Sequence, residues 1–173
     1  MTATRKTMEE GLAKEHLFSA MNSAIMNDNI QEVKDLLRAG LDVNKKDYSG
    51  LSALMSAAAC DRKEIMRLLI EHGADIDESN KDGDTALIFA VQYGHKDTVQ
   101  LLIDKGADPN KKNLSGRTAL SWAKFKGQQA TADILQQAIE ARKTQPTQTA
   151  HGIAFQRQQR LKQMTNGIRR APS

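Results

Sequence analysis

Apolar positions recur along this chain with a period of 33 residues. One series consists of the leucines at 36, 69, 102 and 135, and a second consists of Val33, Met66, Val99 and Ala132. Between these positions, short apolar runs with helical spacing alternate with polar stretches that contain glycine. A fixed period of this length indicates an array of similar supersecondary units.

Each period predicts two short helices joined by a turn. Hydroxyl residues suited to an N-cap precede the first apolar run of three units, at Ser52, Thr85 and Thr118. Glycines follow the second run at the C′ position, at Gly40, Gly73 and Gly106. Helices of about eight residues do not persist alone in water, so stacking of the units must supply the stability.

Three stretches at this period carry a common motif. They are Gly50-Leu-Ser-Ala-Leu-Met-Ser-Ala57, Gly83-Asp-Thr-Ala-Leu-Ile-Phe-Ala90 and Gly116-Arg-Thr-Ala-Leu-Ser-Trp-Ala123. With closing pieces such as Gly73-Ala-Asp-Ile-Asp77, they resemble the ankyrin repeat over about residues 14–141. The resemblance implies an all-α solenoid of about four stacked helix-turn-helix units with short β-hairpin-like loops. The expected units are 14–46, 47–79, 80–112 and 113–141, within a repeat domain at 1–141.

The departures from the family motif carry their own expectations. Residues 55, 88 and 121 replace the family's histidine, so its imidazole hydrogen bonds are absent, and we expect apolar contacts of Met55 and Ile88 instead. Thr7-Met-Glu-Glu10 reads as a capping box and predicts one longer helix over about 8–27 as the N-terminal cap. Ala132, Gln136 and the surrounding glutamines are typical of a C-terminal capping repeat.

Charge separates the chain into two parts. Residues 142–173 hold seven basic and no acidic side chains, whereas residues 1–141 hold 18 basic and 21 acidic ones. We therefore expect a basic, Gln-rich tail at 142–173 that is largely disordered. The mildly acidic repeat domain is unlike a basic nucleic-acid-binding domain.

The sequence offers little catalytic chemistry. The only cysteine is Cys60, which excludes an intrachain disulfide framework and a cysteine-rich zinc site. No phosphate-binding loop, nucleophile elbow or zinc-protease motif is present, and the histidines fit structural positions. We expect no enzyme activity, no cofactor, no metal and no small-molecule substrate. Without a secretory leader or an apolar stretch of roughly 20 residues, a cytoplasmic location is expected.

Binding of a protein partner, whose identity the sequence does not name, is the remaining function. The resemblance implies contacts on the hairpin tips and on the exposed side of the first helices, which together form a concave groove. Tyrosine and arginine are favoured residue types at such interfaces. The residues at the matching positions are Met26, Asn27, Tyr48, Ser49, Leu51, Ala59, Cys60, Lys81, Asp82, Asp84, Gln92, Tyr93, Leu114, Ser115, Arg117, Phe125 and Lys126. Trp122, by contrast, is expected in the core.

The tail is a candidate second contact. Its charged and aromatic residues are Phe155, Arg157, Arg160, Lys162, Arg169 and Arg170. It could be a linear motif, a tether to nucleic acid or an anionic membrane, a solubilising segment, or a segment that folds back onto the acidic body. The whole chain is then an adaptor, an inhibitor or an assembly subunit. The alternatives are a tail-driven accessory protein for nucleic acid or membranes, and a regulatory subunit of an enzyme.

Overall fold

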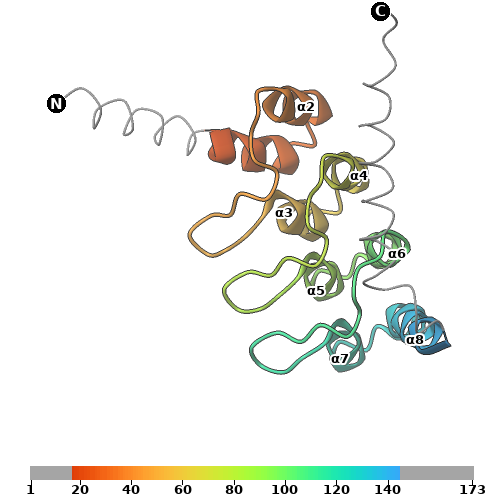
Figure 1. Ribbon diagram of the computed structural model, residues 1–173. Helices are drawn as coiled ribbons and strands as arrows, with labels where there is room; N and C mark the ends of the chain where they lie inside the picture. The colour runs from red at the N-terminus through yellow and green to blue at the C-terminus, as the bar shows by residue number, and fades with distance from the viewer. Residues whose placement is uncertain (1–16, 145–173) are drawn as a thin grey trace, which may run out of the picture. The chain divides into compact units, whose positions relative to one another are not determined.

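The structure, a computed structural model, describes residues 17–144 (Figure 1). The segments 1–16 and 145–173 lie outside the described residues, and with them most of the predicted tail and the start of the predicted N-terminal helix. Residues 17–26 are helical, in line with the later part of that prediction. The further helices are α2 (Ile30–Arg38), α3 (Ala53–Ala59), α4 (Lys63–Glu71), α5 (Ala86–Gln92), α6 (Lys96–Asp104), α7 (Ala119–Phe125) and α8 (Gln129–Thr144).

The helices form the all-α ankyrin-type stack that the sequence predicts. The chain divides into two compact units, residues 1–136 and 137–173, and the stack occupies the described part of the first. The helix at 17–26, α3, α5 and α7 form one column, here called the inner helices (Figure 1). The outer helices, α2, α4, α6 and the start of α8, form a second column. The main contacts join helices of the same or adjacent units.

Three loops, here called fingers, project from the inner-helix column (Figure 1). They span residues 42–51, 75–84 and 108–117, each between an outer helix and the next inner helix. No strand occurs in the described range, but isolated antiparallel bridges join Lys46 to Ser52 and Ser79 to Thr85. The first two fingers are therefore hairpin-like at their bases.

The predicted helix ends are confirmed. Ser52 and Thr85 accept hydrogen bonds from the backbone N–H groups three residues on, each at 3.4 Å, and Thr118 does so at 3.2 Å. The glycines that end the second helices have positive φ, at +83° for Gly40, +91° for Gly73 and +99° for Gly106. Both signals are local in sequence, which is why they could be predicted.

The replacement of histidine by apolar residues is also confirmed. Met55 and Ile88 are each only 1% exposed and belong to the continuous core. In the fourth unit the equivalent residue is Ser121, which is exposed, as is Lys124 where earlier units bury Ala58 and Val91. The last inner helix thus turns a polar face away from the stack, as a capping repeat does.

Hydrogen bonds tie the outer helices α4, α6 and α8 to the preceding unit. Arg62 Nη2 donates to the Met26 carbonyl at 2.9 Å, and His95 Nε2 lies 3.0 Å from the Ala59 carbonyl oxygen. Gln128 Nε2 donates to the Val91 carbonyl at 2.9 Å. Residues 62, 95 and 128 stand one period apart at the start of α4, α6 and α8. Three different side chains therefore bond to carbonyls at the C-terminal ends of the preceding inner helices.

Candidate partner-binding face

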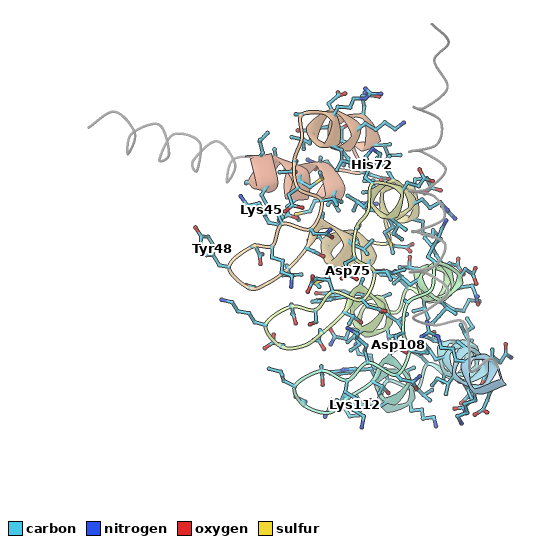
Figure 2. The ribbon with its side chains drawn as sticks, viewed as in Figure 1. Lys45, Tyr48, His72, Asp75, Asp108 and Lys112 are labelled. Carbon is cyan, nitrogen blue, oxygen red and sulfur yellow. The ribbon has the colours of Figure 1, made fainter. Side chains whose placement is uncertain are left out.

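One polar side chain organises the tip of each finger. Asp47, Asn80 and Asn113 stand one period apart, and each side-chain oxygen accepts two backbone hydrogen bonds from within its own finger. The distances are 2.8 and 2.8 Å in the first finger, 2.9 and 2.8 Å in the second, and 3.1 and 2.9 Å in the third. This arrangement fixes the tip backbone and holds Tyr48 at the end of the first finger, where it points away from the helices (Figure 2).

Neighbouring fingers are also bonded to one another. The Lys81 N–H donates to the Ser49 carbonyl at 3.1 Å, and the Leu114 N–H donates to the Asp82 carbonyl at 2.8 Å. The close approach depends on glycine, because a Cβ at Gly50 would lie 2.8 Å from the Lys81 nitrogen. The three tips thus form a connected edge along which Ser49, Lys81, Asp82 and Leu114 are placed.

The most exposed large apolar side chains lie on the fingers and the inner helices. They lie either at a finger tip or at the C-terminal end of an inner helix, and in the described range none lies on an outer helix. They are Met26 (66% exposed), Tyr48 (83%), Tyr93 (60%), Leu114 (81%) and Phe125 (73%). All five stand at positions that the family resemblance singled out. We call the finger tips and these helix ends the inner face.

Arg117, Trp122 and Phe125 form a cluster at the last unit. The Arg117 guanidinium carbon lies 4.7 Å from the centre of the Trp122 ring and 5.2 Å from that of Phe125. The two rings meet edge to face, with centroids 5.9 Å apart. Trp122 is half-buried and packs against the core with one side. The core prediction for Trp122 was therefore incomplete, because the ring also supports an exposed arginine.

Several of the predicted contact residues hold the units together. Asp84 accepts from Gln92 at 3.2 Å and from Asn113 at 2.8 Å, so both of its carboxylate oxygens are engaged. Lys126 Nζ donates to the Gln92 carbonyl at 2.5 Å. Tyr93 stacks on the His95 ring. Leu51 and Cys60 are half-buried.

A pocket that the sequence did not indicate lies between the helix at 17–26 and the first finger. Its lining includes Phe18, Asn22, Lys46 and Tyr48. Asn22 Oδ1 is buried there and has no hydrogen-bond partner among the described residues. The first unit lacks the glycine-led motif that begins the other three, so no sequence signal pointed to this pocket.

One ion pair joins the bases of the first two fingers. Lys46 Nζ on the first finger donates to Glu78 Oε1 on the second at 2.5 Å and to the Ser79 carbonyl at 2.9 Å. The hydrogen bond from Lys46 lowers the pKa of Glu78, partial burial opposes this shift, and the Ser79 N–H lowers the pKa further.

The described residues contain no group of His, Cys, Asp and Glu arranged to hold a metal ion. Between residues 17 and 144, no helix has the length and apolar character needed to cross a membrane.

Comparison with known proteins identifies the repeat. Curated protein sequences give no match to the chain. The sequence family described as ankyrin repeats (3 copies) matches residues 20–113 and 78–147, which together are well over half of the chain. Ankyrin repeats generally act as protein–protein interaction modules and are typically not enzymes. By its repeat motif, its stacked helix pairs and this match, the chain belongs to the ankyrin-repeat family.

Proposed function

We propose that this protein is a non-enzymatic adaptor, inhibitor or assembly subunit that binds one protein partner through its inner face. The observation that carries the proposal is that the exposed large apolar side chains of the described residues, Met26, Tyr48, Tyr93, Leu114 and Phe125, all lie on that face. Exposed apolar surface of this kind, rimmed by polar residues, is typical of protein interaction sites. The hydrogen bonds that fix the finger tips keep the ordering cost of association low.

Within the inner face, residues fall into two roles. Tyr48, Tyr93, Arg117 and Phe125 are the expected hot spots, because they are large and exposed, and ring contacts hold the last three in place. Asp84, Gln92 and Lys126 are expected to hold the surface in shape more than to contact the partner, since their polar groups already bond to one another's units or within their own. The remaining proposed contacts are Ser49, Leu51, Cys60, Lys81, Asp82 and Leu114.

The basic tail is proposed as a second contact with the same partner. Its seven unopposed positive charges at 142–173 also favour a second function, in which the tail tethers the chain to nucleic acid or to an anionic membrane. We place the protein in the cytoplasm, where ankyrin-repeat proteins are common.

A pull-down from the source cells, read by mass spectrometry, tests these proposals. Four full-length baits are compared, of which the first is the native chain. The Tyr93/Phe125 variant carries Tyr93→Ala and Phe125→Ala, and the control carries Arg67→Ala and Gln100→Ala. In the tail variant, five basic residues are changed to Gln: Arg157, Arg160, Lys162, Arg169 and Arg170. The control substitutions lie on the exposed side of the outer helices α4 and α6.

The expected result is one protein that the native chain and the control retain and the Tyr93/Phe125 variant loses. The tail variant should retain it more weakly. If only the tail variant loses its captured material, and that material is nucleic acid or lipid, the tail-driven function replaces the proposed one.

A further inference from the structure

Positive charge is concentrated on the third finger and α7. Residues 109–132 hold five basic side chains and no acidic one, whereas residues 17–108 hold ten basic and sixteen acidic ones. All five are exposed: Lys111, Lys112, Arg117, Lys124 and Lys126. The part of the stack formed by the third finger and α7 is therefore basic, and this asymmetry is separate from that of the tail.

Arg117 is held in place at this end without an ionic partner. Its guanidinium lies over the Trp122 and Phe125 rings, and within residues 17–144 it makes no ion pair. Other exposed arginines in that range, such as Arg38 and Arg67, pair with a carboxylate on their own helix. Stacking on aromatic rings leaves the N–H edge of a guanidinium able to bind a carboxylate with two hydrogen bonds. Arg117 is thus preorganised for an acidic group.

Exposed apolar side chains lie on the same finger and helix as this cluster. Leu114, 81% exposed, lies three residues before Arg117 on the same finger, and Phe125, 73% exposed, lies against the guanidinium. Lys124 and Phe125 follow Ser121 by three and four residues on α7, so all three lie on one exposed face of the helix. Leu114, Arg117, Trp122, Lys124 and Phe125 together are called the unit-four patch.

We infer that the unit-four patch binds a partner segment in which acidic side chains flank an apolar one. The inference rests on the proposed function and names the chemistry of its partner. Charge complementarity favours an acidic segment, and Leu114 and Phe125 supply contacts that a phosphate backbone does not use. An extended polyanion would run from this patch onto the acidic remainder of the stack, where like charges repel it.

The patch contains its own reporter, because Trp122 is the only tryptophan in the chain. A random-peptide library is panned against the full-length protein. The enriched peptides are synthesised and titrated while the Trp122 emission is followed. Versions with Asp and Glu changed to Asn and Gln serve as uncharged controls. A single-stranded oligothymidylate and vesicles containing phosphatidylserine are titrated in the same way.

The expected result is enrichment of acidic–apolar peptides that change the Trp122 emission and bind at least about tenfold more weakly once uncharged. Arg117→Glu should abolish the response, and Arg117→Lys should weaken it because a lysine cannot form the paired hydrogen bonds. Lys34→Glu on α2 makes the same charge change far along the sequence and should leave binding unchanged. Urea midpoints of all variants check that they are folded.

The other outcomes are distinct. Peptides without acidic residues that bind at Trp122 would overturn the inference and leave the proposed function standing. A Trp122 response to the oligonucleotide or the vesicles alone would overturn both the inference and the proposed function. A lack of any peptide response up to about 1 mM, or a response that Arg117→Glu does not alter, would also overturn the inference.

Discussion

Glycines at equivalent points of the three fingers have different neighbours. Gly50, Gly83 and Gly116 all have positive φ, between +72° and +79°. A Cβ at Gly50 or Gly83 would meet the backbone of the next finger at 2.8 Å, whereas one at Gly116 would meet nothing within 4 Å. Glycine therefore provides the left-handed backbone conformation in all three fingers. In the first two fingers it also leaves room for the backbone of the next finger.

Alanine at these glycines should separate the two purposes. Gly116→Ala should lower the free energy of unfolding by about 1–2 kcal/mol, the cost of the left-handed backbone alone. Gly50→Ala and Gly83→Ala should cost about 1–2 kcal/mol more, because each must also break a bond between fingers. Urea unfolding measures all three. Equal costs would mean that the close approach of the fingers contributes nothing.

Glu78 predicts a local pH dependence. Its pKa is lowered in the folded state, so its ion pair with Lys46 stabilises the protein above the carboxyl's unfolded pKa and is lost as the pH falls through the folded value. Glu78→Gln should cost at most about 1 kcal/mol at neutral pH, because the pair is partly exposed. The difference from the native protein should vanish in acid. Thermal unfolding across pH checks this, and a constant difference would contradict it.

Among the elements, the helix boundaries were predictable and the links between helices were not. N-cap hydroxyls and C′ glycines act within one turn of backbone, so Ser52 or Gly73 identifies its own role. The links at Arg62, His95 and Gln128 share a register position but no residue type, and no motif reveals them. The inner-face positions followed from register in the same way. The stacking of Arg117 on Trp122 did not, because it depends on how side chains orient between finger and helix.

The link at His95 can be tested with the residue that the next unit uses. Gln128 bonds to the Val91 carbonyl, which corresponds to that of Ala58, so a glutamine at this register reaches the end of the preceding inner helix one residue earlier. His95→Gln should therefore keep a hydrogen bond to the end of α3 and change the free energy of unfolding by less than about 0.5 kcal/mol. His95→Ala removes any such bond and should cost about 1 kcal/mol. Equal losses in the two variants, measured by urea unfolding, would show that the imidazole acts by packing alone.

At the scale of the whole stack, stability comes from contacts between adjacent units. The core runs without interruption from Met21 to Leu135, and no single unit contains a core of its own. An interior repeat has a neighbouring repeat on each side. The fourth repeat, as far as it lies within residues 1–136, has a neighbour on one side. In such an array, the effect of a core substitution depends on where it lies as well as on the size of the cavity. The candidate binding surface is densest in the fourth unit, so local opening there would also remove it.

Matched leucines test this dependence on position. Leu102 and Leu135 are equivalent, and both are 0% exposed. Leu102→Ala in the third unit should cost about 2–5 kcal/mol and shift the whole unfolding transition. Leu135→Ala should instead open the last unit first, because only one interface holds it. Urea unfolding followed by both circular dichroism and Trp122 fluorescence separates the two cases, since Trp122 reports the fourth unit alone.

The two signals should stay coincident in Leu102→Ala, whereas in Leu135→Ala the fluorescence transition should move to lower urea than the dichroism transition. Coincident transitions in both variants would mean that the fourth unit unfolds only with the rest, and the binding surface would then be as stable as the core.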